Sequence, residues 1–473
     1  MIRNLFIITS FIFLLNNAYA EVFNDALKKA YNNNSELNAE RENINISEQE
    51  LKISMSSYFP TITLEGTKSE EDTTKLTNRD GTNATITDTD PETKSISITQ
   101  TIFDFGRGAD YSKSKIGINL AKAKLLKKEQ DILYKTVAAY TGLISANEKL
   151  EINKANFELL NRQVETDRIR LERGQITLSD VSQSESSLAG AEASLIQAQN
   201  DLLTSKLNYE NIIGPISNAQ SLDKNSIINY QIPGSLKTAI ELSKKNNPDL
   251  IIAEMEYEQS KKDTSIARSE LAPTAKLSLE KSYSEDLNST YDEKEKETLK
   301  ATVTWPFFSG GKNIASLNKN KNIENRSRLT LDSEIKQNQT NVASAWSNYQ
   351  SNKSLLNSVQ LQVRAAEIAN EGITAEYNSG SSGRTTLEVI QSNKSLLNSV
   401  QLQVRAAEIA NEGITAEYNS GSSGRTTLEV IQSNSLLLNA QISLADSERN
   451  FILSQFNLLK SIGLLNSDYL KLR

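Results

Sequence analysis

The chain has 473 residues with 59 Asp and Glu against 52 Lys and Arg, and it contains neither cysteine nor histidine. The lack of cysteine excludes disulfides and thiolate metal sites, and the lack of histidine removes the commonest general base and metal ligand. A net charge of −7 argues against nucleic acid as a partner, and only 7 prolines permit very long helices. We expect a mainly helical protein that is not an enzyme and binds no cofactor or metal.

The first segment, 1–20, is typical of a secretory signal peptide. Arg3 supplies the positive start, Leu5–Leu15 is the apolar core, and Ala18–Ala20 is a small-residue cleavage site. The apolar run is too short for an anchor that spans a bilayer. Cleavage would remove one arginine, leaving a mature charge of 51 − 59 = −8 on a chain exported across the inner membrane.

Two long segments after the signal, 21–220 and 221–473, carry the same features in the same order. Each begins with a short helix, followed by a proline with a short alternating stretch, a polar loop and a second alternating stretch. Each then continues with a very long helical run, a glycine break and a shorter helical run. Pro60 matches Pro273 in this order, which indicates a duplicated structural unit.

Period-two alternation predicts two β-hairpins, one within 58–104 and one within 273–308. An aromatic cluster closes the second strand of each hairpin, a pattern found in outer-membrane strands. A half-buried soluble sheet is the competing interpretation. However, four strands cannot cover themselves, and open sheet edges cannot face lipid. Membrane strands would therefore require several subunits, and three subunits with four strands each would give 12.

Heptad spacing predicts the long helices. Apolar residues seven apart run from Val181 to Tyr209, and a matching stripe runs from Val430 to Leu458. The seven-residue period favours left-handed supercoiling, and small residues beside each stripe let helices approach closely. The run from Arg107 to Leu171 would extend about 100 Å at about 1.5 Å per residue. A coiled-coil rod is the alternative, and the export signal and strand pairs argue against it.

A tandem duplication interrupts the second half. Residues 350–390 recur unchanged as 391–431, with a period of 41 residues. The copies have not diverged, so they indicate a recent in-frame event or an error in the sequence. Each copy contains the end of a long helix, a glycine-rich turn and the start of a return helix. Two reversals would leave the chain running the wrong way, so we expect one copy to form a bulged or disordered segment near the turn.

These features together resemble the TolC-like outer-membrane efflux proteins over nearly the whole mature chain. The most specific parts are the paired proline-and-strand stretches, TIFDFGRG at 101–108, RGQITLSDV at 173–181 and GRTTLEVIQSN at 424–434. The resemblance implies a long α-helical coiled-coil barrel protomer with four transmembrane β-strands in two structural repeats. It also implies a homotrimer, with a 12-stranded barrel in the outer membrane of a Gram-negative bacterium and a helical tunnel in the periplasm.

The resemblance implies a passive exit duct for efflux or type I secretion. The implied partners are a periplasmic adaptor (a membrane fusion protein), an inner-membrane ABC or proton-driven transporter, and outer-membrane lipid. A secreted or periplasmic coiled-coil structural or adaptor protein is the alternative, although the sequence has no lipoyl-like β domain of the kind an adaptor needs. An enzymatic alternative rests on SGGK at 309–312, which lacks the spacing and the Ser or Thr of a phosphate loop.

The resemblance also places a gate at the helical tips. The first tip lies around Gly174, with Ser179 and Asp180 in the positions of gate-network residues. Their partners in the second half are the pair Tyr377 and Arg384 or the duplicated pair Tyr418 and Arg425. A carboxylate beside a guanidinium accepts a charge-assisted bond, which would hold the tunnel mouth shut.

An acidic ring at the mouth is the last implied feature. Glu388 or its duplicate Glu429 occupies the position of a ring residue, and three copies of an acid on a narrow axis would favour cations. The second acid of the family, one turn on, is replaced by Gln391 or Gln432, which argues against a strong cation-binding ring. Solvated tip residues are the alternative for each of these charges.

Overall fold

The structure is a computed structural model. It describes residues 22–70, 72, 74–83, 89–216, 222–224, 227, 230–286, 292–379 and 427–472. Within 356–379, and at several positions of 427–440, only the backbone is described. The predicted signal peptide and most of the tandem duplication lie outside the described residues.

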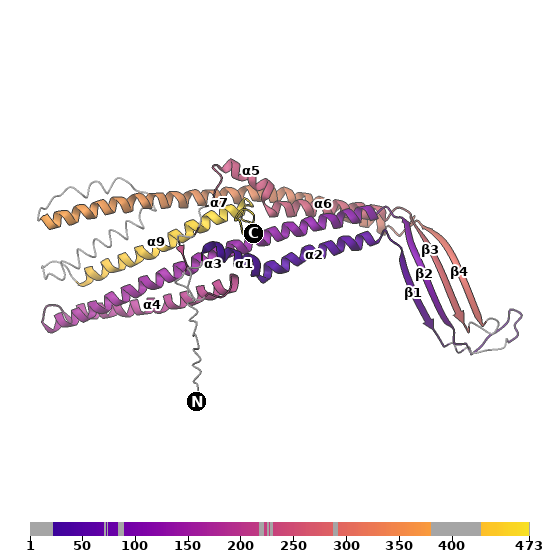
Figure 1. Ribbon diagram of the computed structural model, residues 1–473, viewed down its shortest axis with the longest axis horizontal. Coiled ribbons are helices and arrows are strands. Elements are labelled where there is room, and N and C mark those ends of the chain that lie inside the picture. Colours follow the sequence, from indigo (N-terminus) through magenta and orange to yellow (C-terminus); the bar gives the residue numbers. More distant parts are fainter. Residues whose placement is uncertain are drawn as a thin grey trace, which may run out of the picture. The chain divides into compact units, whose positions relative to one another are not determined.

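Long helices and one sheet make up the described chain (Figure 1). The helices are α1 (Phe23–Asn33), α2 (Ser35–Ser56), α3 (Arg107–Glu172), α4 (Leu178–Ile212), α5 (Leu236–Asn246), α6 (Pro248–Ser269), α7 (Lys312–Ser379) and α9 (Thr427–Ser461). The strands are β1 (Thr61–Lys68), β2 (Glu92–Phe103), β3 (Thr274–Glu285) and β4 (Glu293–Thr304). None of the described helices is both long enough and apolar enough to cross a bilayer.

The helices form pairs of matching length, with one member from each half of the sequence. Helices α1 and α5 both have 11 residues, and α2 and α6 both have 22. Helices α4 and α9 both have 35, while α3 has 66 and α7 has 68. This matching confirms the predicted architecture of two structural repeats, in which each long helix is followed by a shorter one.

The chain divides into two compact units. The first unit comprises Met1–Asn38, Lys128–Asn247 and Gln339–Arg473, and the second comprises Ala39–Lys127 and Pro248–Asn338. Each half of the sequence contributes to both units, because the long helices run from one into the other. The repeats are therefore units of sequence and not of packing, and their predicted boundary near residue 220 stays a prediction.

The second unit carries an antiparallel sheet with strand order β1-β2-β3-β4. The helices that adjoin the strands follow the same order, α2, α3, α6 and α7 (Figure 1). Three contacts connect neighbouring helices of the series: Ser54 Oγ to the Asp110 carboxylate at 2.5 Å, Lys113 to Asp263 at 2.7 Å, and Asn313 Nδ2 to the Glu270 carbonyl at 2.9 Å. Strands β1 and β4 are the edges of the sheet.

The core of the first unit is built on buried aromatic rings. Phe23 of α1 lies edge-on to Tyr140 of α3 at 5.2 Å and to Phe456 of α9 at 5.7 Å between ring centroids. Tyr230 contacts the same Phe456 at 5.6 Å. Such pairs add about 0.5–1.5 kcal/mol each beyond the apolar area that they bury. The cluster therefore joins α1 to the middle of α3 and the end of α9.

Candidate functional site

The turn between α3 and α4, around Gly174, is the tip predicted from the first half. Gly174 has φ +69°, a left-handed conformation that favours glycine. Its N–H donates to the Leu171 carbonyl at 2.8 Å, and the Gln175 N–H donates to the Arg170 carbonyl at 2.9 Å. These two bonds form the Schellman motif that ends α3 by satisfying its last carbonyls. The reversal is thus determined by local backbone chemistry.

Asp180 closes the other side of the same turn by capping α4. The Thr177 N–H and hydroxyl donate to the Asp180 carboxylate at 2.9 and 2.7 Å, and the Asp180 N–H donates to Thr177 Oγ1 at 3.3 Å. This is a capping box with Asp in place of Glu or Gln. The hydrogen bonds from the Thr177 backbone and side chain lower the pKa of Asp180 from its usual value of 3.8. The carboxylate is therefore charged at neutral pH.

The predicted gate residues are only partly within the described chain. The structure brings Asp180 together with the turn at Gly174, while Ser179 is exposed in the first turn of α4. Tyr377 falls in α7 and Glu429 in α9, at positions where only the backbone is described. Four predicted residues lie outside the described residues: Arg384, Glu388, Tyr418 and Arg425. The gate network and the acidic ring stay predictions.

Asp167 is a buried acid near the tip that the sequence analysis missed. Its side chain is 0% exposed and accepts hydrogen bonds from Ser184 Oγ at 2.5 Å and from Gln163 Nε2 at 3.1 Å. Ser184 belongs to α4, so the bond joins the two helices of the tip. An ion pair between Arg168 and Glu185, at 2.7 Å, lies one residue further along both helices. Ser184 is one of the small residues beside the apolar stripe that runs from Val181 to Tyr209, and this position was the available signal.

Lys224 forms a second polar cluster within the first unit. Its ammonium bridges Glu148 of α3, at 2.8 Å, and Glu448 of α9. Burial alone would lower the pKa of Lys224, but the hydrogen bonds to both carboxylates outweigh burial and raise the pKa above 10.5. The cluster therefore carries two negative charges and one positive charge, and it ties the two helices to the segment after α4.

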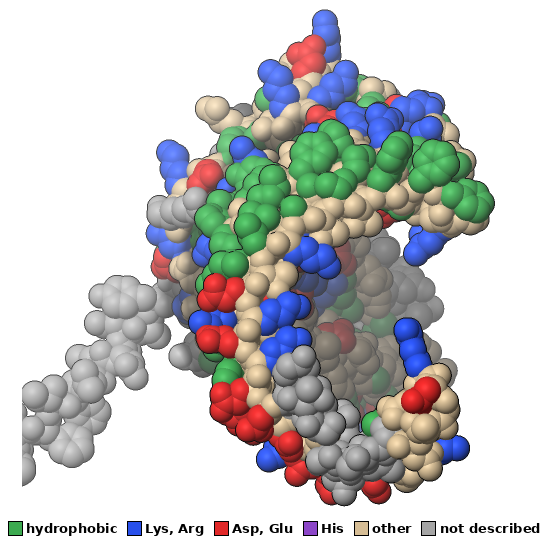
Figure 2. Space-filling view, turned by 90° about the vertical axis from the view of Figure 1, so that its right-hand side faces the viewer, with side chains coloured by type: hydrophobic (Ala, Val, Ile, Leu, Met, Phe, Trp, Pro, Cys, Tyr) green, Lys and Arg blue, Asp and Glu red, His purple; other side chains and the backbone are tan. Residues whose placement is uncertain are grey.

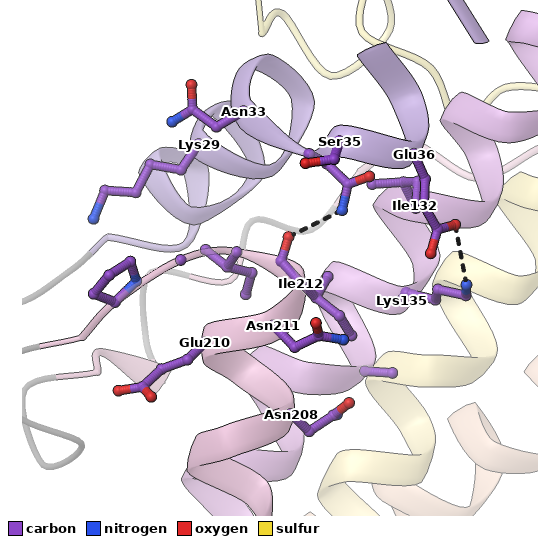
Figure 3. A pocket seen from close by; sticks show the side chains of 15 residues that line it. Lys29, Asn33, Ser35, Glu36, Ile132, Lys135, Asn208, Glu210, Asn211 and Ile212 are labelled. Atoms are coloured by element: carbon purple, nitrogen blue, oxygen red, sulfur yellow. Dashed lines mark hydrogen bonds and ion pairs between the residues drawn. The ribbon is translucent and has the colours of Figure 1, made fainter. Parts of the chain in front are cut away.

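A cavity of about 730 Å³ opens at the junction of α1 and α2, opposite the end of α4 (Figure 3). Glu36 lies within 2.6 Å of Lys128 and 3.9 Å of Lys135, and Asn34 Nδ2 donates to the Ile212 carbonyl at 3.4 Å. The hydrogen bond from Lys128 lowers the pKa of Glu36, and the charge of Lys135 adds to the effect. The described residues contain no group of three His, Cys, Asp or Glu that could hold a metal ion.

The sheet presents two chemically different faces, because side chains alternate along each strand. We call one the apolar face; its register rows include Ile62–Ile98–Leu279–Leu299 and Gln100–Leu277–Ala301. Further along the strands the same face is charged, in the rows Leu64–Ile96–Lys281–Glu297 and Gly66–Lys94–Tyr283–Glu295. Figure 2, which views the sheet end, shows hydrophobic side chains gathered in one band and acidic side chains gathered elsewhere.

We call the opposite side the polar face. Its register rows are Thr61–Thr99–Ser278–Lys300, Thr63–Ser97–Glu280–Thr298, Glu65–Ser95–Ser282–Lys296, Thr67–Thr93–Ser284–Lys294 and Thr101–Lys276–Thr302. Every position in these rows is polar. A sheet with one apolar and one polar face suits a wall between lipid and water.

Comparison with known proteins agrees with this architecture. The sequence model of the outer membrane efflux protein family matches residues 26–215 and 239–394, about three quarters of the chain. The outer membrane efflux protein BepC of Brucella suis is 25% identical over 375 residues, covering 79% of each chain. The proteases secretion protein PrtF of Dickeya chrysanthemi is 24% identical over 380 residues, covering 77% of this chain and 80% of its own.

A solved structure shows the same fold. The crystal structure of the outer membrane protein VceC from Vibrio cholerae superposes with a TM-score of 0.67 at 16% identity, covering 93% of this chain and 96% of that one. This chain therefore belongs to the outer membrane efflux protein family, whose members are channel proteins of the outer membrane that serve efflux or secretion and are not enzymes.

Proposed function

We propose that three copies of this chain close a 12-stranded barrel in the outer membrane and a helical tunnel in the periplasm, which together form a passive exit duct. The sheet is the observation that carries the proposal. It has four strands with two edges, β1 and β4, and exposes Ile62, Leu64 and Leu299 at 63%, 77% and 71%. Unpaired edges are costly in lipid, and single-chain barrels need about eight strands or more.

The edge helices of the second unit support a ring of identical chains. Helix α2 exposes Ile46, Ile53 and Met55 at 54%, 70% and 41%, and α7 exposes Ile314 and Leu329 at 60% and 53%. Contact between α7 of one copy and α2 of the next would bury these aliphatic side chains. Head-to-tail contacts of this kind close into a ring when the rotation between copies is suitable.

The energy for transport comes from partners in this proposal. A periplasmic adaptor and an inner-membrane ABC or proton-driven transporter would engage the tip formed by α3 and α4 and the predicted tip of the second half. A capped, charged turn at Thr177 and Asp180 supports a rigid docking point, because both ends of the reversal are satisfied by local hydrogen bonds.

The assembly is tested on purified full-length protein. We expect heat-modifiable trimers in outer-membrane fractions and discrete single-channel currents in planar bilayers. Ile53→Asn should weaken the trimer, because it places a polar group in the proposed contact, whereas Glu48→Gln on the same helix should leave the trimer intact. A monomer that is free in the periplasm and forms no channel would contradict the proposal and favour the coiled-coil structural alternative.

The gate assignment needs its own test, because Asp180 also caps a helix. Asp180→Ala should alter the closed-to-open behaviour of single channels if the carboxylate holds the mouth shut. Thr177→Ala is the matched control, since it removes the cap and retains the acid. Unchanged gating in Asp180→Ala, or an equal change in Thr177→Ala, would remove Asp180 from the gate.

A further inference from the structure

We infer that the exit barrel favours anions, and that four lysines on the polar face of the sheet set this preference. The inference rests on the proposed trimeric barrel, whose interior would be lined by that face. The lysines are Lys276 on β3 and Lys294, Lys296 and Lys300 on β4. The property follows from strand register and residue alternation within this sheet.

The position of the charged residues along the strands indicates which face of the sheet is turned toward water. Lys300 lies in register with Ser278, next to the apolar row that contains Leu279 and Leu299 on the opposite face. Lys276 is paired with Thr302, two residues further toward the helices. Both lysines are thus at the level of the apolar rows, where an ammonium that faced hydrocarbon would be costly. The polar face must therefore be the face that contacts water inside the barrel.

The charges of the polar face do not cancel. Against the four lysines, the rows contain two acids, Glu65 and Glu280, so each chain contributes 4 − 2 = +2. Three chains would give 3 × 2 = +6 around the lumen, although each chain as a whole carries −7. Acidic residues of the connecting turns, such as Asp80 and Asp286, lie beyond the strands and do not belong to this face.

The lysines are available to ions that pass. All four side chains are exposed, and none forms an ion pair with a residue that the structure describes. The contrast with the apolar face is clear, because Lys94 there pairs with Glu92 at 2.5 Å and Lys281 pairs with Glu295 at 2.7 Å. Lys94 and Lys281 are thus neutralised by neighbouring carboxylates, whereas the four lysines of the polar face have no such partner among the described residues.

Their spacing distributes the charge through the barrel. Lys294 and Lys300 are six residues apart on one strand, which corresponds to about 20 Å at about 3.4 Å per residue. The remaining positions of the face are mostly Ser and Thr, which solvate ions of either sign. Unpaired fixed charge of one sign in a confined, low-dielectric wall concentrates counter-ions, so the barrel would enrich anions over cations.

The test is the reversal potential of single channels in a KCl gradient. The lumen variant combines Lys296→Gln and Lys300→Gln. The matched control combines Lys94→Gln and Lys281→Gln, which removes two lysines per chain from the opposite face. We expect the chloride-to-potassium permeability ratio to fall about twofold or more in the lumen variant and to stay constant in the control.

A second measurement uses the wild-type protein alone. Inorganic tripolyphosphate added on the barrel side should reduce the current, and raised salt should relieve this block because it screens the lysines. Reversal potentials that coincide in the wild-type protein and the lumen variant would overturn the inference, as would an equal shift in the control. Channels that conduct without this selectivity refute only the inference, whereas no conductance in any variant refutes the proposed duct and the inference with it.

Discussion

At the scale of single residues, Gly463 lies at a position that leaves no room for a side chain. It follows α9 with φ +80°, and a Cβ at this position would lie 2.2 Å from the Asn246 carbonyl oxygen. Its N–H and that of Leu464 donate to the Lys460 and Leu459 carbonyls at 3.0 and 2.9 Å, which ends α9 in a Schellman motif. Both the backbone conformation and the close approach therefore require glycine.

Gly463→Ala is expected to destabilise the protein by more than about 2 kcal/mol, because it combines left-handed strain with a backbone clash. The measurement is thermal unfolding followed by circular dichroism. Gly190→Ala in α4 is the matched control, because nothing lies within 4 Å of a Cβ there. Similar melting curves for the two variants would contradict the packing described at Gly463.

The capping box at the tip gives a second prediction at this scale. Thr177→Ala should cost about 1 kcal/mol, because the N-terminus of α4 loses a hydrogen bond to its orphan N–H groups. Ser179→Ala, two residues along, should be nearly neutral, since Ser179 is exposed and caps nothing among the described residues. Thermal unfolding of both variants distinguishes a capping role from a general loss of a hydroxyl.

The same cap predicts a dependence on pH. The folded-state pKa of Asp180 is lowered from 3.8, so its contribution to stability is present above pH 3.8 and is lost as the pH falls through the folded value. The stability difference between the wild-type protein and Asp180→Asn should therefore be constant at neutral pH and shrink below pH 3.8. A difference that persists unchanged into strong acid would argue against the charged cap.

At the scale of elements, polar contacts hold specific helices together. Lys224 joins α3 and α9 through Glu148 and Glu448, and its side chain is 38% exposed. Because the cluster is partly solvated, we expect Lys224→Met to cost only about 1 kcal/mol. Lys206→Met is the control, since the ion pair that Lys206 forms among the described residues is a long one, 3.8 Å, with Glu210 of the same helix α4.

The Lys224 cluster should respond to alkaline pH. The folded-state pKa is raised above 10.5, so the contribution is fully present below pH 10.5 and is lost as the pH rises through the folded value. Urea titrations at neutral and alkaline pH measure this contribution in the wild-type protein and in Lys224→Met. An equal stability difference at both ends of the range would show that the ammonium does not act through its charge.

Helix ends at the tip could be predicted from sequence, whereas the contacts between helices could not. The heptad run from Arg107 to Leu171 became α3, which ends one residue later at Glu172. Glycine at 174 and the capping spacing of Thr177 and Asp180 are local signals in the sequence, because short-range hydrogen bonds alone end α3 and begin α4 there. The burial of Asp167 depends on which face of α4 meets α3, and that is decided by packing across the whole pair.

At the scale of the whole molecule, the segment between α7 and α9 is much longer than its counterpart. It has 47 residues, from 380 to 426, whereas the segment between α3 and α4 has 5, from 173 to 177. Removing one 41-residue copy would leave 6. The flanking helices already match their partners in length, and Ile431, at 6% exposed, packs with Leu160 of α3 and Ala191 of α4. The helices thus need only one copy.

Deletion of 391–431 is therefore expected to raise thermal stability and the amount of protein in the outer membrane. The physical reason is that restricting a long extra segment costs conformational entropy, and this segment has no counterpart in the first half with which to pair. The measurements are the dissociation temperature of the trimer and its abundance in outer-membrane fractions. A deletion variant that loses both stability and export would show that the second copy is required.

The sequence by itself determined the order and kind of the elements, because alternation and heptad spacing encode which side of a strand or helix is apolar. The duplication is also visible in the sequence alone, since each half repeats the same pattern of alternation and heptad spacing. Only the tertiary structure decided that the halves interleave into two compact units, and that Lys224, Asp167 and Phe23 meet partners distant in the chain. Those contacts depend on how long helices pack against one another, and no local pattern of residues specifies that.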